Sequence, residues 1–427
     1  MKKAITGLSA ILLSLPILAQ LQFRNLKEVL NYADKNSLIA KATLLAEKVA
    51  EKDASLYRAT LIPRIEFTTT ADYNILIPSM VVPDKLVGGT EGKYSSIKLG
   101  LPATFTPALE FSVPIINQEK WEEMKKLVLE KEKAKHNTGI QLEHLHIQLA
   151  QAYFNILVAR ELLFISTESK TTIEQLLSIL KQRHKEGILQ PIDYNRAKQL
   201  QADIDNNSIN WSLFLKKSTN ELYHLLNVSL TDSINLLEKL SPTWELNEML
   251  EASNRPAFLA VKTSLRIAEQ SLLQSKKAAL PKLHLQARYA YQWQIQQGQT
   301  IQFDMSSVGV RFGVPLFAGG FYKTAQKKAA ILTEAAKIQV QQSLAQLKKE
   351  QSDWITQFTT AKHKQKNLQQ KIAATADNLR IAQLSIREGV MEFDDFNTIF
   401  QEWLRTRMEH LQVLNEGLLY QFILTQK

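Results

Sequence analysis

Four stretches of the chain alternate between apolar and polar residues, which is the pattern of a β-strand with one apolar and one polar face. In the first, about residues 64–76, the odd positions are mainly apolar and the even positions mainly polar. The same parity continues across a second stretch, about residues 96–113. The third and fourth stretches cover about residues 282–295 and 303–316. We therefore expect four strands, which follow one another along the chain as two pairs.

Two long segments after these pairs show helical periodicity instead. Residues 117–186 and 321–388 carry apolar residues at spacings of three and four, which predicts an amphipathic helix. Each segment ends at a Glu-Gly pair, and glycine readily takes the left-handed conformation that ends a helix. A turn and a returning helix follow, at about 193–227 and 395–426. A helix of about 70 residues is roughly 100 Å long, more than a globular domain needs.

The chain also matches itself. Four landmarks occur twice, in the same order and at nearly the same spacings, which makes a chance match improbable. We therefore expect two repeats of helix, strand, strand, long helix, hairpin and return helix: residues 20–227 and 254–427, joined by a linker at 228–253. The landmark pairs are Asn36 and Asn254, Pro63 and Pro281, Pro114 and Pro315, and Gly187 and Gly389.

The alternating stretches suit a transmembrane barrel, in which apolar side chains face lipid and polar side chains face the lumen. A soluble sheet packed on the helices is the alternative, since it would alternate in a similar way. The second stretch, however, is longer than the roughly 9–11 residues that cross a bilayer. Four strands cannot close a barrel, and an open sheet edge is not tolerated in lipid. We therefore expect other copies of the chain to complete the sheet.

The first 19 residues indicate export. Lys2 and Lys3 precede an apolar stretch at 4–18, and Ala19 marks a processing point, so we expect residues 1–19 to be a signal peptide. An uncleaved membrane anchor is the alternative. No run of about 18 apolar residues follows, so we expect no transmembrane helix. The sequence contains no cysteine, which excludes disulfides and a lipid-modified N-terminal cysteine.

The net charge of +10 is compatible with a nucleic-acid partner. Lysine and glutamate are mixed along the expected helices, however, as at 119–135, which favours solvated helix faces and no nucleic acid. His144 and His146 lie two residues apart, on different sides of a helix, so we expect no metal site. No phosphate-binding loop or catalytic triad pattern is present. The sequence therefore predicts neither an enzyme nor a cofactor.

These features together resemble the TolC family of outer-membrane efflux proteins. The resemblance covers essentially the whole chain after residue 19. The matching elements are the signal peptide, the doubled plan, Ile62-Pro63 and Leu280-Pro281 before the strands, the sequence Val-Pro-Leu-Phe-Ala-Gly-Gly at 314–320, and a Gly followed six residues later by Asp in both hairpins.

The resemblance implies a mixed fold, with a transmembrane β-barrel and an all-α tunnel. Three copies would contribute four strands each to one twelve-stranded outer-membrane barrel, which continues into a periplasmic α-helical barrel. The linker at 228–253 would belong to a belt around this tunnel. The implied function is the exit duct of a tripartite efflux or type I secretion system, a passive channel in the outer membrane of a Gram-negative bacterium. Its partners would be a periplasmic adaptor protein, an inner-membrane pump and outer-membrane lipid.

The resemblance also directs attention to the two hairpins, near 187–193 and 389–395. Asp193, Asp394 and Asp395 are candidates for rings of carboxylates that select cations and gate the tunnel. In the family a second acid follows three residues after the position of Asp395, where this chain has Thr398. The alternative, which can coexist with gating, is that Asp193 and Asp395 are N-caps of the returning helices. The candidate adaptor contacts are Gly187, Ile188, Leu189, Gly389, Val390 and Met391.

A second class of function remains open at this point. A periplasmic scaffold of coiled coils with a soluble β domain would share the long helices and the signal peptide. The two hypotheses differ in extraction behaviour, because a barrel needs detergent and a scaffold does not.

Overall fold

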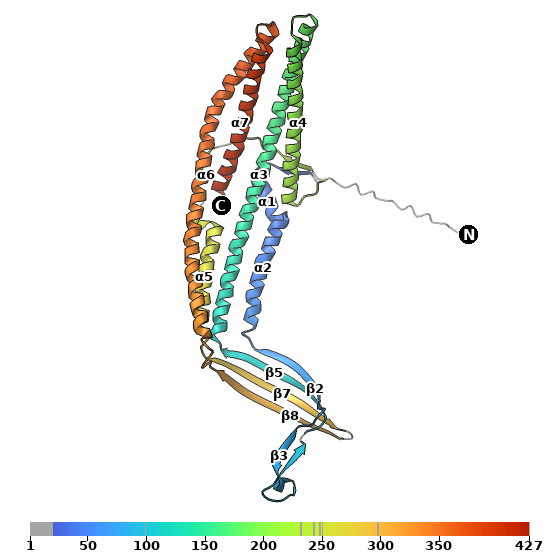
Figure 1. Cartoon of the computed structure of the whole chain (residues 1–427), viewed down its shortest axis with the longest axis vertical. Helices are drawn as coiled ribbons and strands as arrows, with labels where there is room; N and C mark the ends of the chain where they lie inside the picture. The colour runs from blue at the N-terminus through green and yellow to red at the C-terminus, as the bar shows by residue number, and fades with distance from the viewer. Residues whose placement is uncertain are drawn as a thin grey trace, which may run out of the picture. The chain divides into compact units, whose positions relative to one another are not determined.

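A computed structural model of the chain describes residues 20–98, 100–230, 233–241, 244–246, 249, 251–296 and 299–426. The expected signal peptide, residues 1–19, lies outside this described part. Figure 1 shows the elements in chain order. They are β1 (Gln20–Phe23), α1 (Leu26–Asn36), α2 (Leu38–Ala59), β2 (Arg64–Tyr73), β3 (Ser79–Pro83), a 3-10 turn (Asp84–Val87), β4 (Tyr94–Lys98), β5 (Ala103–Ile116), α3 (Gln118–Lys185), α4 (Pro191–Leu226), β6 (Ser233–Leu236), a 3-10 turn (Ala252–Asn254), α5 (Pro256–Lys277), β7 (Lys282–Gln296), β8 (Gln299–Gly313), α6 (Phe321–Glu388) and α7 (Phe393–Thr425).

The chain forms two compact units. Unit 1 comprises the described residues of Met1–Leu45, His136–Phe258 and Ser343–Lys427. Unit 2 comprises the described residues of Ala46–Lys135 and Leu259–Gln342. The helices α2, α3, α5 and α6 contribute residues to both units.

Unit 1 is helical and has a core of its own. Its main elements are α4, α7 and the later parts of α3 and α6 (Figure 1). The large side chains Tyr153, Phe396 and Phe400 are completely buried in it. One 18-residue window of α3 is apolar enough to cross a membrane by length and composition, with a mean hydropathy of 1.2. Because 67% of this window is buried inside the protein, a place in the core accounts for its composition.

A small parallel pair of strands, β1 and β6, lies in unit 1 and was not expected from the sequence. Leu21 pairs with Ile234 and Phe23 with Leu236. Four-residue strands are too short to show a reliable alternation, which explains why the pattern missed them. The linker beyond β6 is held on α3, because the Tyr153 hydroxyl donates to Glu238 Oε2 at 2.5 Å.

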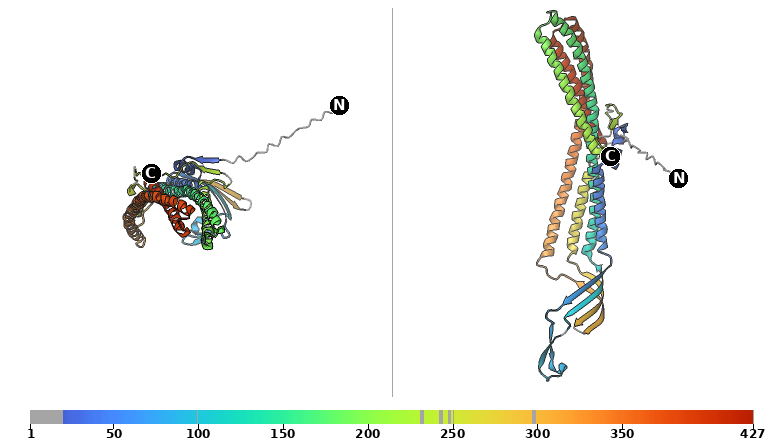
Figure 2. Two further views of the ribbon diagram at one scale, coloured as in Figure 1. Left: turned by 90° about the horizontal axis from the view of Figure 1, so that it is seen from above. Right: turned by 90° about the vertical axis from the view of Figure 1, so that its right-hand side faces the viewer.

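Unit 2 contains a four-stranded antiparallel sheet in the order β2-β5-β7-β8 (Figures 1 and 2). The expectation of one strand across about residues 96–113 was wrong. Residues Tyr94–Lys98 form β4, which pairs with β3 in a separate two-stranded hairpin, and β5 begins only at Ala103. Gly100 has a φ of 114°, which ends the extended conformation, and Pro102 has no backbone N–H for a ladder. These two residues explain the division.

Candidate functional site

The two faces of the sheet in unit 2 differ in polarity. Residues that lie directly opposite one another on antiparallel strands point to the same face. The row Ile65, Phe111, Ala287 and Val308 belongs to the apolar face, and the next row, Glu66, Glu110, Arg288 and Ser307, belongs to the polar face. Ile65, Phe67, Val308, Val310 and Phe312 are exposed. The apolar face is therefore uncovered within one chain, which argues against a soluble sheet packed on the helices.

Charged groups gather on the polar face of the sheet. Glu66 lies directly opposite Glu110, an arrangement of like charges that is unfavourable by itself. Each carboxylate has a cation beside it, since Arg64 Nη2 lies 3.2 Å from Glu66 and Arg288 Nε lies 3.4 Å from Glu110. The four groups form a band of balanced charge across three strands, as expected of a surface in contact with water.

The two edges of the sheet carry no further strand. β2 and β8 are the outermost strands of the order β2-β5-β7-β8, so each leaves one row of backbone N–H and C=O groups without a partner strand in the described chain. Helices of unit 2 also present apolar residues to solvent. Val49 and Leu56 on α2, and Ile331 and Ile338 on α6, are exposed and in each case seven residues apart, on one helix face.

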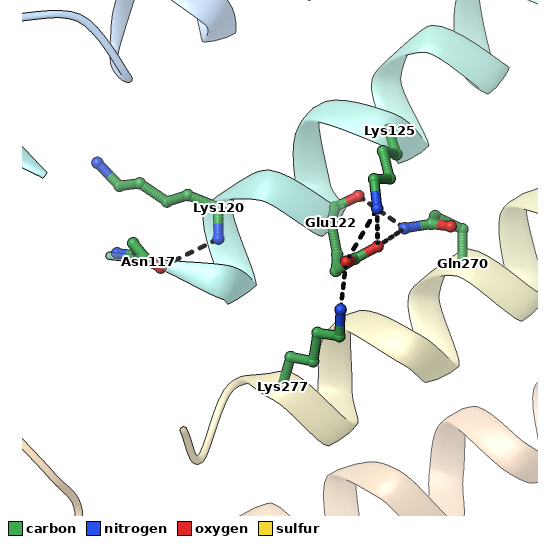
Figure 3. Close-up of polar contacts among 6 residues, drawn as sticks. All are labelled: Asn117, Lys120, Glu122, Lys125, Gln270 and Lys277. Atoms are coloured by element: carbon green, nitrogen blue, oxygen red, sulfur yellow. Dashed lines mark hydrogen bonds and ion pairs between the residues drawn. The ribbon is translucent and has the colours of Figure 1, made fainter. Parts of the chain in front are cut away.

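A buried carboxylate joins α3 to α5 next to the sheet strands (Figure 3). Glu122 is only 2% exposed, and its Oε1 lies 2.6 Å from Lys277 Nζ and 3.1 Å from Lys125 Nζ. Gln270 Nε2 donates to Glu122 Oε2 at 2.5 Å and to its backbone oxygen at 3.1 Å. Burial raises the pKa of this carboxyl, but the bonds from Lys277, Gln270 and Lys125 together outweigh burial and lower the pKa below its ordinary 4.5. Glu122 is therefore an ionised anchor between two helices.

The hairpin of α3 and α4 and the hairpin of α6 and α7 are connected inside unit 1 by arginines. Arg183 of α3 donates to the backbone oxygens of Ile386 at 3.0 Å and Arg387 at 2.6 Å, which are carbonyls in the last turn of α6. Arg196 of α4 contacts the Asp394 carboxylate of α7, and its Nη1 lies 3.8 Å from Asp193. The arginine thus bridges two of the three candidate gate carboxylates.

The interpretation of Asp193 and Asp395 as N-caps was wrong. The caps of α4 and α7 are Gln190 and Glu392, neither of which makes a side-chain cap hydrogen bond. Proline at the first position starts α4 because its fixed φ suits a helix and its missing N–H costs nothing there. Both aspartates lie in the first turn instead, where a carboxylate is favoured by the helix dipole. Among the described residues, Asp395 has no hydrogen-bond or ion-pair partner and is exposed.

The six tip residues divide into three kinds. Gly187 and Gly389 have φ values of 71° and 82°, so both take the left-handed conformation. Ile188 and Val390 are exposed apolar residues. Leu189 and Met391 instead pack against the core of unit 1. Ile188 and Val390 are therefore the more accessible to a partner through their side chains.

A hollow of about 1270 Å³ lies among α3, α4 and α7 in unit 1. Its lining mixes the aromatic Trp211 with the charged Glu402, Arg405 and Glu409. This volume exceeds the range of about 300–1,000 Å³ usual for a small-molecule pocket, and its lining is more polar. Within the described part of the chain, no group of three His, Cys, Asp or Glu residues could hold a metal ion.

The family model of outer membrane efflux proteins matches residues 249–418. This region belongs to the outer membrane efflux protein family. The resemblance to TolC-type proteins is thereby confirmed, together with its general attributes of outer membrane, efflux and transport. The family comprises transport ducts and not enzymes. Comparison with curated proteins gives no match.

Solved outer-membrane channels share the fold of nearly the whole chain. The outer membrane protein VceC of Vibrio cholerae is 15% identical, with a TM-score of 0.77 over 94% of this chain and 96% of VceC. The open-state MtrE channel of Neisseria gonorrhoeae is also 15% identical, with a TM-score of 0.75 over 94% of this chain and 88% of MtrE. CusC, described as forming a transmembrane channel, has 14% identity and a TM-score of 0.78 over 93% and 90%.

Several residues that connect elements of the chain could not be identified from the sequence. Arg183, Arg196 and Glu122 are ordinary members of charged helices in the sequence, which predicts solvated helix faces. Their partners on other helices lie between 148 and 204 residues away in the chain. No local pattern identifies such partners, because the choice depends on which helices become neighbours.

Proposed function

We propose that the protein is the outer-membrane exit duct of an efflux or type I secretion system, formed by three copies of the chain. The observation that carries this proposal is the sheet of unit 2, whose apolar face is exposed and whose two edges, β2 and β8, are unpaired. A bilayer provides the solvent that such a face requires, and neighbouring copies provide the missing strands.

The direction of the strands supports ring closure. All neighbours in the order β2-β5-β7-β8 are antiparallel, so β2 and β8 run in opposite directions. When β8 of one copy lies beside β2 of the next, the new pair is antiparallel as well. Three copies supply twelve strands, an even number as in bacterial outer-membrane barrels, and leave no open edge. The exposed stripes of α2 and α6 would continue this contact between copies as helix packing.

The polar face would line the water-filled lumen. The balanced band of Arg64, Glu66, Glu110 and Arg288 suits this position, since lumen-facing side chains must remain hydrated. On this proposal the apolar face, with Phe67, Tyr289 and Val308, contacts lipid.

The helices of each copy would form a periplasmic tunnel that the two hairpins close. We place the gate at Asp395, Asp394 and Asp193. Asp395 has no cation beside it in the described chain, so three-fold symmetry would make it a ring of free carboxylates, which attract cations and repel one another. The exposed Ile188 and Val390 at the tips would contact a periplasmic adaptor protein, which connects the duct to an inner-membrane pump.

Disulfide cross-linking tests the ring, because the chain has no cysteine of its own. Thr68→Cys on β2 is combined in turn with Ser307→Cys and Gly309→Cys on β8; all three positions lie on the polar face. We expect detergent-extracted protein to form covalent trimers at one of these registers, which a reductant dissolves. A chain that leaves membranes without detergent and stays monomeric would refute the barrel and favour the periplasmic scaffold.

Single-channel conductance in a planar bilayer tests the gate. Wild type should give discrete, cation-selective steps, and Asp395→Ala should alter them because the ring loses its charge. Steps that do not respond to the substitution would support the duct but remove Asp395 from the gate.

A further inference from the structure

The polarity of β8 reverses halfway along the strand. From Ser307 to Gly313 its apolar residues Val308, Val310 and Phe312 lie on the apolar face of the sheet. Between Gln299 and Ser306 the apolar residues Ile301, Phe303 and Met305 lie on the polar face instead, opposite Gln294, Gln292 and Ala290 of β7. The pairing with β7 continues without a bulge from Gln299 to Gly313, so the reversal is a property of the sequence and not of the backbone.

These three residues, which we term the apolar ladder, are accessible. Ile301, Phe303 and Met305 are 51%, 37% and 41% exposed. On the proposed function they point into the aqueous lumen, while Gln302 and Asp304 point outwards. Apolar groups in contact with water are unfavourable, so a ladder of three such side chains indicates a surface that is covered in the assembly.

The hairpin of β3 and β4, residues 79–98, also exposes apolar side chains to solvent. Its two strands pair only with each other. Met80 projects to one face, and Val81 and Tyr94 to the other; all three are exposed, as are Leu86 and Val87 at the turn. An isolated two-stranded hairpin is marginally stable in water, so this one needs a packing surface.

Chain connectivity brings the hairpin of one copy to the ladder of the next. Tyr73 ends β2 in the same row as Thr300 of β8, at the side of the sheet away from its helical connections. In the proposed ring, β2 of one copy lies beside β8 of its neighbour, and only residues 74–78 separate β2 from β3. Within its own chain, by contrast, β5 and β7 lie between β2 and β8.

We propose that the β3–β4 hairpin of each copy packs on the apolar ladder of the neighbouring copy and forms a lid over the outer mouth of the barrel. This inference rests on the proposed function, because it requires β2 of one copy to lie beside β8 of the next. Three hairpins on three ladders cover the apolar side chains of both partners. They also constrict the exit at the end of the lumen opposite to the helices.

Cross-linking between differently marked copies tests the lid. One chain carries Phe303→Cys, and a co-expressed, differently tagged chain carries either Met80→Cys or Val81→Cys. These hairpin positions project to opposite faces, so they are matched controls for each other. We expect a mixed covalent dimer, which a reductant dissolves, with only one of the two hairpin variants.

The strand-edge pairs, Thr68→Cys with Ser307→Cys or Gly309→Cys, distinguish a failure of the lid from a failure of the proposed duct. If they cross-link and neither hairpin variant does, the lid is refuted and the duct stands. If the strand-edge pair fails as well, both fail. Equal cross-linking of both hairpin faces would indicate a hairpin without a fixed orientation and would also refute the lid.

Discussion

The helical core of unit 1 and the sheet of unit 2 bury their large side chains to opposite extents. Phe400 on α7 is 0% exposed, whereas Phe312 on β8 is 66% exposed. Unit 1 thus has a core made from one chain, while the apolar face and edges of the sheet have no counterpart within it. One chain is therefore enough for the core of the helical hairpins, whereas the sheet, on the proposed function, needs lipid and further copies.

Phenylalanine-to-alanine substitutions in the two regions should differ most in their effect on stability. Phe400→Ala should lower the free energy of unfolding by about 3–5 kcal/mol, because it empties a filled core. Phe312→Ala removes an equal side chain from an exposed face and should cost less than about 1 kcal/mol. Thermal unfolding in detergent, followed by the helical circular dichroism signal, measures both. Equal losses would show that Phe312 is as deeply buried in the assembled protein as Phe400 is in its own chain.

The junction of α3 and α5 is stabilised by a buried ion pair between Glu122 and Lys277. Glu122→Ala leaves Lys277 without its carboxylate at 2.6 Å and should cost about 3 kcal/mol, the usual penalty for breaking a buried pair. Glu123→Ala is the control, because Glu123 pairs with Lys126 at 2.9 Å but is more exposed. It should cost at most about 1 kcal/mol. If the two variants unfold alike, Glu122 does not anchor the helices.

Acid should remove the contribution of Glu122. Its pKa in the folded protein lies below the ordinary 4.5, so the folded state favours the ionised form. The resulting stability is fully present above pH 4.5 and is lost as the pH falls through the lower, folded-state pKa. The difference in melting temperature between wild type and Glu122→Gln should therefore shrink below about pH 4.5. A constant difference across this range would contradict the assignment.

The two tip glycines of unit 1, Gly187 and Gly389, have different surroundings. Both have positive φ, so alanine should cost about 1 kcal/mol at either position. A Cβ on Gly187 meets open space, whereas one on Gly389 would lie 2.9 Å from Arg183 Nη2 and displace the guanidinium from the end of α6. Gly389→Ala should therefore cost about 2 kcal/mol in total, against about 1 for Gly187→Ala, in chemical denaturation. Equal costs would mean that Arg183 moves aside freely.

Periodicity predicted the long helices and the alternating strands because each signal is local and repeated over many residues. It wrongly predicted one continuous strand across Gly100 and Pro102. The odd positions stay apolar there, although the extended backbone is interrupted between β4 and β5. It also placed the start of β8 near 303, whereas the strand begins at Gln299. The reversal of polarity at Ser306 and Ser307 explains the late predicted start. The apolar positions from Val308 to Val314 all lie on one face, and this alternation does not continue towards Gln299.

The candidate gate shows the other limit of sequence reasoning. The Gly-to-Asp spacing identified the hairpins, but Arg196, which neutralises Asp394, lies 198 residues away from it. Any ring formed by Asp193 and Asp394 therefore also contains Arg196, which offsets their charge. No local sequence pattern reveals the pairing of Arg196 with Asp394. Asp395 alone remains a free carboxylate among the three.

Removing Arg196 should have the smallest effect on stability and a clear effect on charge. Its pair with Asp394 is largely exposed, with 44% and 59% of the two side chains accessible, so Arg196→Ala should cost less than about 1 kcal/mol. The substitution also frees Asp193 and Asp394, which raises the negative charge of each tip. If the tips line the gate, cation selectivity in a planar bilayer should rise, and more so at low salt, where charges are less screened. Lys170→Ala, which breaks a similarly exposed pair with Asp205 at 2.8 Å, is the control. An equal change in selectivity from both variants would place the selective charges away from the tips.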